Sequence, residues 1–208
     1  MSLARLELAP RPGLGESLVP IWDRLGSAGA TWTGAERVAI ASVARAARLG
    51  EGSTGGLDPV AARAARTVAA RPASIRRSWV DGVIAAGLDQ ARYVELVAVV
   101  GRVVAIDTLL EALGLDLEPL PEPLAGDPSY EIDRGARLGR AWVPMVGGAS
   151  IVQALSLVPA ENAELERLHG PLYLTFEEMA DPHVDKGLSR PQMELVAART
   201  SAHNECFY

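Results

Sequence analysis

The chain has 208 residues and a formal net charge of −6, a length that allows one good core or one small domain and part of another. It is 49% hydrophobic, 22% charged and only 5% aromatic, and its abundance of Ala, Leu, Val and Arg favours helix. Lys186 is its only lysine and the arginines are spread among acids, which argues against a surface that binds nucleic-acid phosphates. Charged residues interrupt the longest apolar stretch, residues 93–110, which argues against a membrane span, so we expect a cytoplasmic protein.

The first half of the chain carries the signals of a helical bundle. TGAERVAIASVARAARLG opens with a Thr cap, places apolar residues at helical spacing and ends in a glycine. The Gly-rich run that follows breaks the chain, and Asp58 with Pro59 restarts it. The stretch at residues 88–114 is long and apolar on most sides, which predicts a buried central helix. The predicted helices lie at residues 33–50, 58–70, 72–87 and 88–114.

A Pro-rich stretch divides the chain. Residues 115–135 contain four of the 14 prolines and no apolar period, which is typical of a linker or an extended wrapping arm. We therefore expect one unit at residues 1–116, a linker at 117–133 and a second unit at 134–208. In the second unit the sequence predicts helices at 147–159, 160–179 and 190–204, with a loop at 180–187.

The last predicted helix repeats the pattern of the first. Laid without gaps on WTGAERVAIASVARAARLG, the segment LSRPQMELVAARTSAHNEC puts its helix-start signals in register and Cys206, the only cysteine, opposite Gly50. Glu194 and Cys206 are twelve residues apart, which on one straight helix is about 18 Å and too far for proton transfer. The helix must end between them, with Asn204 as a plausible breaker, so that Cys206 starts a following helix whose N-terminal dipole favours a thiolate.

The run LSRPQMELVAARTSAHNECFY resembles the alkylhydroperoxidase and carboxymuconolactone decarboxylase-like superfamily, in particular its peroxidase-related branch. Redox members of that superfamily carry a Glu, eleven residues, Cys-x-x-Cys, three residues and a His, and Glu194 and Cys206 have the matching separation. Residues 72–114 look like the half that normally follows the redox site. The resemblance implies an all-α orthogonal helical bundle of tandem units, with a degenerate first unit and the front half of a second.

The resemblance also implies a function. The protein would be a thiol- or selenol-dependent peroxidase that reduces hydroperoxides with an external thiol reductant and without a metal, flavin or other cofactor. Glu194 would relay protons and Cys206 would resolve the oxidised intermediate as a disulfide. The attacking residue and the His of the pattern would fall just past Tyr208, so the chain as given should be nearly inactive.

Three explanations of the end at Tyr208 stay open: a random truncation, a shortened protein, and a UGA codon that encodes selenocysteine as residue 209. The third is favoured here, because the sequence stops where the family requires its attacking sulfur or selenium. The codon that follows Tyr208 would decide between them.

Two other functions stay open: a lactone decarboxylase-like enzyme without a redox role, and a non-catalytic binding or oligomerisation module. Unpaired apolar helix faces lead us to expect a homo-oligomer. Glu95 and Asp107 repeat the twelve-residue separation without a cysteine, and we interpret them as helix-pairing or interface polar groups. His203 is interpreted as a satisfied or exposed histidine, although an imidazole so near Cys206 could lower the pKa of a thiol. The histidines 169 and 183 lack ligand-spaced partners, so no metal site is expected, and the four tryptophans, Trp22, Trp32, Trp79 and Trp142, are expected to anchor the core.

Overall fold

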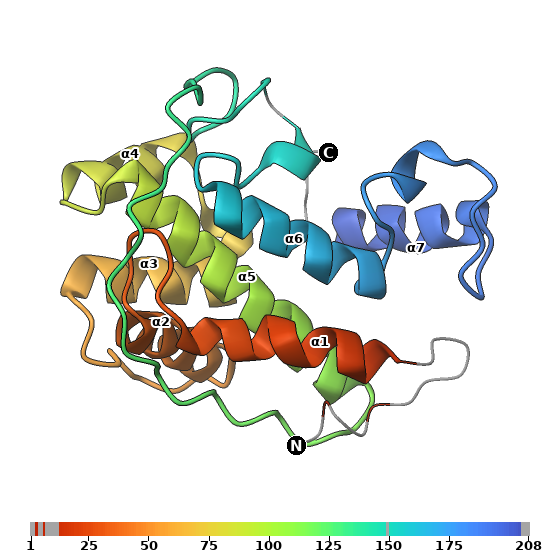
Figure 1. The fold of residues 1–208 in the computed structure, drawn as a ribbon, viewed down its shortest axis with the longest axis horizontal. Helices are drawn as coiled ribbons and strands as arrows, with labels where there is room; N and C mark the ends of the chain where they lie inside the picture. Colours follow the sequence, from red (N-terminus) through yellow and green to blue (C-terminus); the bar gives the residue numbers. More distant parts are fainter. Residues whose placement is uncertain (1–2, 4–5, 7–12, 149, 205–208) are drawn as a thin grey trace.

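The protein is all-helical in the part of the chain that the computed structural model describes, residues 3, 6, 13–148 and 150–204 (Figure 1). In these residues the only β pairing is two isolated antiparallel bridges, so the all-α prediction is confirmed. None of the helices in this part is both long and apolar enough to cross a membrane. The seven α-helices are α1 (Leu14–Asp23), α2 (Gly34–Arg48), α3 (Pro59–Ala70), α4 (Arg77–Ala85), α5 (Gln90–Ala112), α6 (Pro159–Leu172) and α7 (Arg190–His203).

Side-chain caps fix where four of these helices begin. Before α2, the Thr33 hydroxyl accepts from the Glu36 amide and the Glu36 carboxylate accepts from the Thr33 amide, which is a complete capping box. Ser189 and Gln192 form the same capping box before α7, so the two repeats start in register. Asp58 caps α3 and Asp89 caps α5. Each of these carboxylates accepts hydrogen bonds from two backbone N–H groups.

Helices α2, α3, α4 and α5 match the four helices predicted for the first half of the chain, except that α4 begins later than predicted. The helix expected from Pro72 begins instead as a short 3-10 turn, Pro72–Ser74, and α4 starts only at Arg77. Helix α1 was not predicted, although it is amphipathic and buries Leu18 and Trp22.

Two predictions in the second half are wrong. Residues 147–148 and 150–158 form bends, turns and the 3-10 turn Ile151–Gln153 rather than a helix. Gly147 and Gly148 take positive φ angles of 71° and 100°, and the proline at the start of α6 holds Val158 in an extended conformation. The next helix was expected to reach residue 179, but α6 stops at Leu172, where Tyr173 leaves the helical conformation with φ −142° and ψ −92°.

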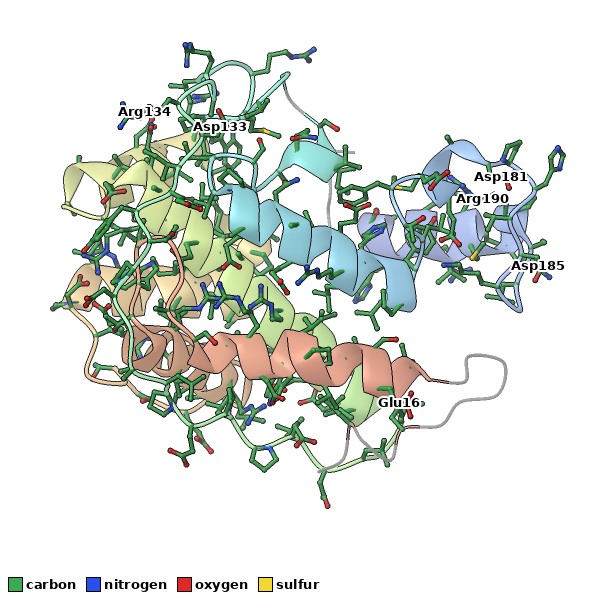
Figure 2. The ribbon with its side chains drawn as sticks, viewed as in Figure 1. Glu16, Asp133, Arg134, Asp181, Asp185 and Arg190 are labelled. Carbon is green, nitrogen blue, oxygen red and sulfur yellow. The ribbon has the colours of Figure 1, made fainter. Side chains whose placement is uncertain are left out.

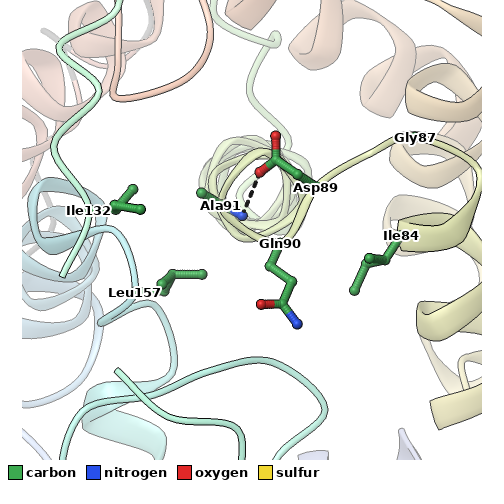
Figure 3. A pocket seen from close by; sticks show the side chains of 7 residues that line it. All are labelled: Ile84, Gly87, Asp89, Gln90, Ala91, Ile132 and Leu157. Carbon is green, nitrogen blue, oxygen red and sulfur yellow. Dashed lines mark hydrogen bonds between the residues drawn. The ribbon is translucent and has the colours of Figure 1, made fainter. Parts of the chain in front are cut away.

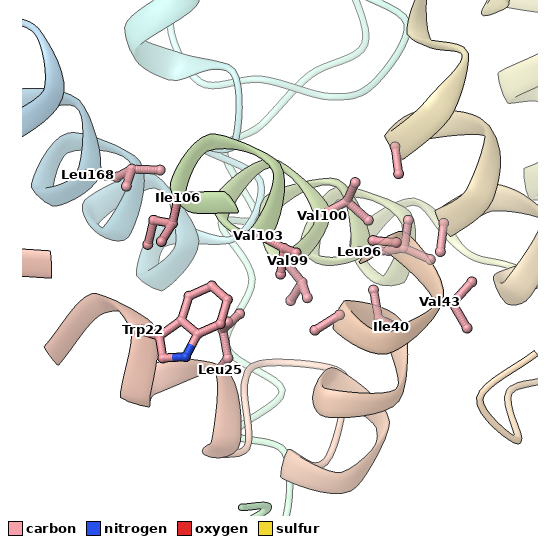
Figure 4. Packing of buried hydrophobic residues seen from close by; sticks show 14 of the residues in the cluster. Trp22, Leu25, Ile40, Val43, Leu96, Val99, Val100, Val103, Ile106 and Leu168 are labelled. Carbon is pink, nitrogen blue, oxygen red and sulfur yellow. The ribbon is translucent and has the colours of Figure 1, made fainter. Parts of the chain in front are cut away.

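Helix α5 is the centre of the core, with α2 and α3 packed against it (Figures 1 and 4). Trp22 and Trp32 are buried, as predicted, and Trp79 is half-buried against the core. Trp142 is 40% exposed, so it is not the core anchor that the sequence suggested. The side chains that Figure 4 labels come from four helices and the 3-10 turn after α1: Trp22, Leu25, Ile40, Val43, Leu96, Val99, Val100, Val103, Ile106 and Leu168.

The Pro-rich stretch runs as an extended strap, residues 115–133, around one side of the bundle (Figure 1). It is pinned by backbone bonds to the loop before α2: the amides of Leu124, Ser129 and Tyr130 donate to carbonyl oxygens of that loop at 2.7–3.0 Å. A wrapping arm thus describes this stretch better than a free linker.

Helix α6 follows the strap and packs on α1 and α5, placing Leu168 in the main core. The C-terminal lobe, residues 173–204, lies to one side of the bundle with α7 (Figure 1). The two-unit division of the chain stays a prediction, and the packing adds that α6 shares the core of the first unit.

Gly34 is a position where no side chain fits, so Gly34→Ala should destabilise the protein. A Cβ atom there would lie 2.2 Å from the Gly26 carbonyl oxygen and 2.7 Å from that of Leu124. We expect a loss of about 2 kcal/mol in the free energy of unfolding, measured by urea denaturation. Gly101→Ala is the matched control: it lies in exposed helix with nothing within 4 Å and should gain about 0.5 kcal/mol. Equal stability of Gly34→Ala and the unchanged protein would contradict the close packing of the strap.

Candidate functional site

Glu194 lies in the second turn of α7, where two neighbours fix its carboxylate. Its Oε1 accepts from the Tyr173 hydroxyl at 2.8 Å and from Arg190 Nε at 2.7 Å. Its side chain is 50% exposed. The hydrogen bonds from Tyr173 and then Arg190 lower the pKa of Glu194, so this carboxylate is ionised at neutral pH.

Arg190 also holds the loop in front of α7. Its Nη1 donates to the carbonyl oxygens of Glu178, Met179 and Asp181, each at 3.2 Å. Figure 2 shows Arg190 and Asp181 in the C-terminal lobe, away from the α2–α5 bundle. One guanidinium therefore connects the loop, the first turn of α7 and Glu194.

The other predicted site residue, Cys206, lies outside the described residues. Helix α7 ends at His203 with Asn204 as its C-cap, as the spacing argument required. His203 is exposed in the last turn. The structure therefore does not test whether Glu194 and Cys206 come together.

His169 has a structural environment. Its Nδ1 lies 2.5 Å from the Leu174 carbonyl oxygen, and its ring packs against Tyr173 and Phe176. Across the described ranges, no three His, Cys, Asp or Glu side chains gather in a way that could hold a metal ion.

A buried charge network that the sequence analysis did not predict joins α2, α5 and α6. Arg37 Nη1 bridges two carboxylates, Glu95 Oε1 at 2.5 Å and Glu161 Oε1 at 2.6 Å. Arg102 Nη2 binds Glu161 Oε2 at 2.9 Å. All four side chains are at most 3% exposed, and their formal charges cancel.

Opposite charges oppose the effect of burial on the pKa values of Glu161 and Arg37. Burial alone would raise the pKa of Glu161, but Arg102 and Arg37 outweigh it, and the pKa is lowered. Burial likewise acts against the charged form of Arg37, and Glu161 and Glu95 outweigh it to raise the pKa. For Arg102 burial dominates, so its pKa is lowered from the ordinary arginine value. Removing one member would leave a buried charge without its partner.

The loop before α2 closes over the network. Thr31 donates its amide and hydroxyl to Glu95 Oε2 at 2.7 and 2.8 Å. A Cβ atom on Gly29 would lie 1.7 Å from Glu95 Oε1, so only glycine allows the backbone to pass this close. One signal was present in the sequence: Arg37 lies on the same face of its helix as the apolar Ile40 and Ala41.

Asp107 pairs helices, as predicted. It accepts two bonds from Arg45 of α2, at 2.9 and 2.7 Å. Arg45 also donates to the Glu118 carbonyl oxygen at 2.9 Å and lies 5.4 Å from the ring centroid of Trp22. Glu95 and Asp107 therefore both anchor α5 to α2.

Glu161→Gln should destabilise the protein by about 3 kcal/mol at neutral pH, because two buried guanidinium groups lose their shared counter-charge. The lowered pKa of Glu161 means that its stabilisation is full above the ordinary value of 4.5 and is lost as the pH falls through the folded-state pKa. The difference between variant and unchanged protein should therefore shrink in acid.

Urea denaturation across the acid range measures this difference. Glu166→Gln is the matched control, since Glu166 is exposed on the same helix. A Glu161→Gln variant that unfolds like this control at every pH would show that the network adds no stability.

Comparison with known proteins gives no relative. No protein-family model matches the chain, and neither a curated protein nor a solved structure does.

Proposed function

We propose that the protein is a thiol- or selenol-dependent peroxidase whose redox centre follows α7. The observation that carries this proposal is the ionised carboxylate of Glu194, held by Tyr173 and Arg190 twelve residues before the only cysteine. The same spacing is typical of the redox members of the superfamily that residues 188–208 resemble. An ionised carboxylate can accept a proton, and the lowered pKa of Glu194 suits a relay that passes the proton on rather than one that keeps it.

The proposed reaction has two steps on the protein. In the first, a thiolate or selenolate three residues after Cys206 attacks the distal oxygen of a hydroperoxide, and the O–O bond breaks. The attacking atom becomes a sulfenic or selenenic acid, and the alcohol leaves with the proton that Glu194 took from the thiol or selenol when the thiolate or selenolate formed. In the second, the Cys206 thiol displaces water to form a disulfide or selenenylsulfide, which an external dithiol then reduces.

Helix geometry limits how Glu194 can act. Nine residues separate it from His203 at the end of α7, which is about 13 Å along a helix. The proposal therefore requires the chain after Asn204 to turn back toward Glu194, or a water to carry the proton between them.

A cysteine appended directly after Tyr208 completes the Cys-x-x-Cys spacing and tests the proposal. Treated with tert-butyl hydroperoxide, the extended chain should form a disulfide with Cys206, detected by mass spectrometry. With dithiothreitol as reductant it should consume the peroxide faster than the 208-residue chain. Glu194→Gln in the extended chain should slow this consumption about a hundredfold, which is the usual contribution of a general base.

Two controls keep the test sharp. Cys206→Ser should abolish the disulfide, and Glu177→Gln, an exposed acid of the same lobe, should leave the rate unchanged. An extended chain that forms no disulfide and consumes peroxide no faster than dithiothreitol alone would contradict the proposal. Equal rates of peroxide consumption for Glu194→Gln and Glu177→Gln would show that Glu194 takes no part in the reaction.

The exposed apolar side chains of α7 favour a second candidate function, an oligomerisation module. Leu195 and Val196 are 63% and 57% exposed. In the matching register of α2, Val196 corresponds to Ile40, which is fully buried in the core. A second copy of the chain that covered this face of α7 would give Val196 the burial that Ile40 has.

Light scattering after size-exclusion chromatography tests this association. We expect a dimer or larger assembly for the unchanged chain and a monomer for Val196→Glu, because a charge in an apolar interface opposes burial. Ala198→Glu, on another face of the helix, should not change the assembly. A monomeric unchanged chain would exclude this candidate.

A further inference from the structure

A pocket of about 440 Å³ lies at the start of α5, within the size range of small-molecule sites. Four parts of the chain build it: the end of α4 with the turn after it, the first turn of α5, the strap, and the segment before α6 (Figure 3). The lining residues are Ile84, Gly87, Asp89, Gln90, Ala91, Ile132 and Leu157.

The walls of this pocket are apolar and tied together. Leu157 is buried in a small cluster that includes Ala91. The Asp133 amide donates to the Leu157 carbonyl oxygen at 2.9 Å, which joins the strap to the segment before α6. Ile84 and Ile132 face the same space from α4 and the strap (Figure 3). The pocket therefore offers mainly aliphatic contacts from a defined frame.

One polar group points into this apolar space. Figure 3 shows the Gln90 carboxamide between Ile84 and Leu157. Asp89 is already engaged, because its Oδ1 accepts from the amides of Ala91 and Arg92 as the cap of α5. Among the described residues, no hydrogen bond engages the Gln90 side chain, so both its donor and its acceptor are open to a ligand.

We propose that this pocket binds a neutral molecule with a short aliphatic chain and a terminal amide. The aliphatic part contacts Ile84, Ile132 and Leu157, and the amide pairs with the Gln90 carboxamide through one donated and one accepted hydrogen bond. The Asp89 carboxylate among the lining residues disfavours an anion, and the aliphatic side chains of Ile84, Ile132 and Leu157 offer an ion no partner. The site is independent of the proposed peroxidase chemistry, which lies on α7.

Hexanamide is a suitable probe, and the methyl groups of Ile84, Ile132 and Leu157 report its binding by NMR. We expect these methyl resonances to shift with saturation in the millimolar range, as is usual for a ligand of so few atoms. Hexanoate, with the same shape and a negative charge, should bind at least about tenfold more weakly.

Gln90→Leu keeps the apolar pocket and removes the amide, so it should weaken hexanamide at least about fivefold, because both hydrogen bonds of the carboxamide are lost. Gln153→Leu, outside the pocket, is the matched control and should leave the affinity unchanged. Absence of shifts at the three methyl-bearing residues would overturn the proposal. Equal binding of hexanoate and hexanamide, or unchanged affinity in Gln90→Leu, would do the same.

Discussion

The contact on which the fold most depends is the bridge from Arg37 to Glu95 and Glu161. It joins α2 to α5 within the first bundle and both of them to α6, which comes after the strap. Buried ion pairs add little net stability, because desolvation offsets much of their attraction, but they strongly penalise any arrangement that separates the charges. The bridge therefore fixes how α6 packs on the bundle, because Glu161 must lie where it can pair with both Arg37 and Arg102.

The path of the strap depends on the same buried ion pairs. Glu95 stays buried only if the loop before α2 covers it, and that loop has Gly29 where the backbone touches the carboxylate. The strap in turn binds this loop through the carbonyl oxygens of Gly26, Gly29 and Ala30. A segment with few apolar residues of its own thus gains a fixed path, because its backbone satisfies groups that the loop must leave unpaired.

Local signals predicted most of the helices, whereas the side-chain partners that the sequence analysis missed lie far along the chain. The caps before α2 and α7 are readable because a capping box is a four-residue motif. The apolar run 147–158 misled because its composition suits a helix, while its flanking glycines and proline forbid one. Glu194 was found through its spacing to Cys206, yet its partner Tyr173 is 21 residues away and carries no local signal. The place of Arg37 on an apolar helix face indicated burial but not its partners, which lie 58 and 124 residues along the chain.

Glu95, Glu161 and Glu194 differ in whether their carboxylates are exposed to solvent. Glu95 accepts three hydrogen bonds and Glu161 two, and both are closed to solvent, so neither can exchange protons without breaking the core. Glu194 also has fixed donors, but half of its side chain faces water. A proton carrier needs a defined position together with access to its donor and acceptor. Of these three carboxylates Glu194 alone combines both, which is why the chemistry is better sought on α7 than in the more strongly charged interior.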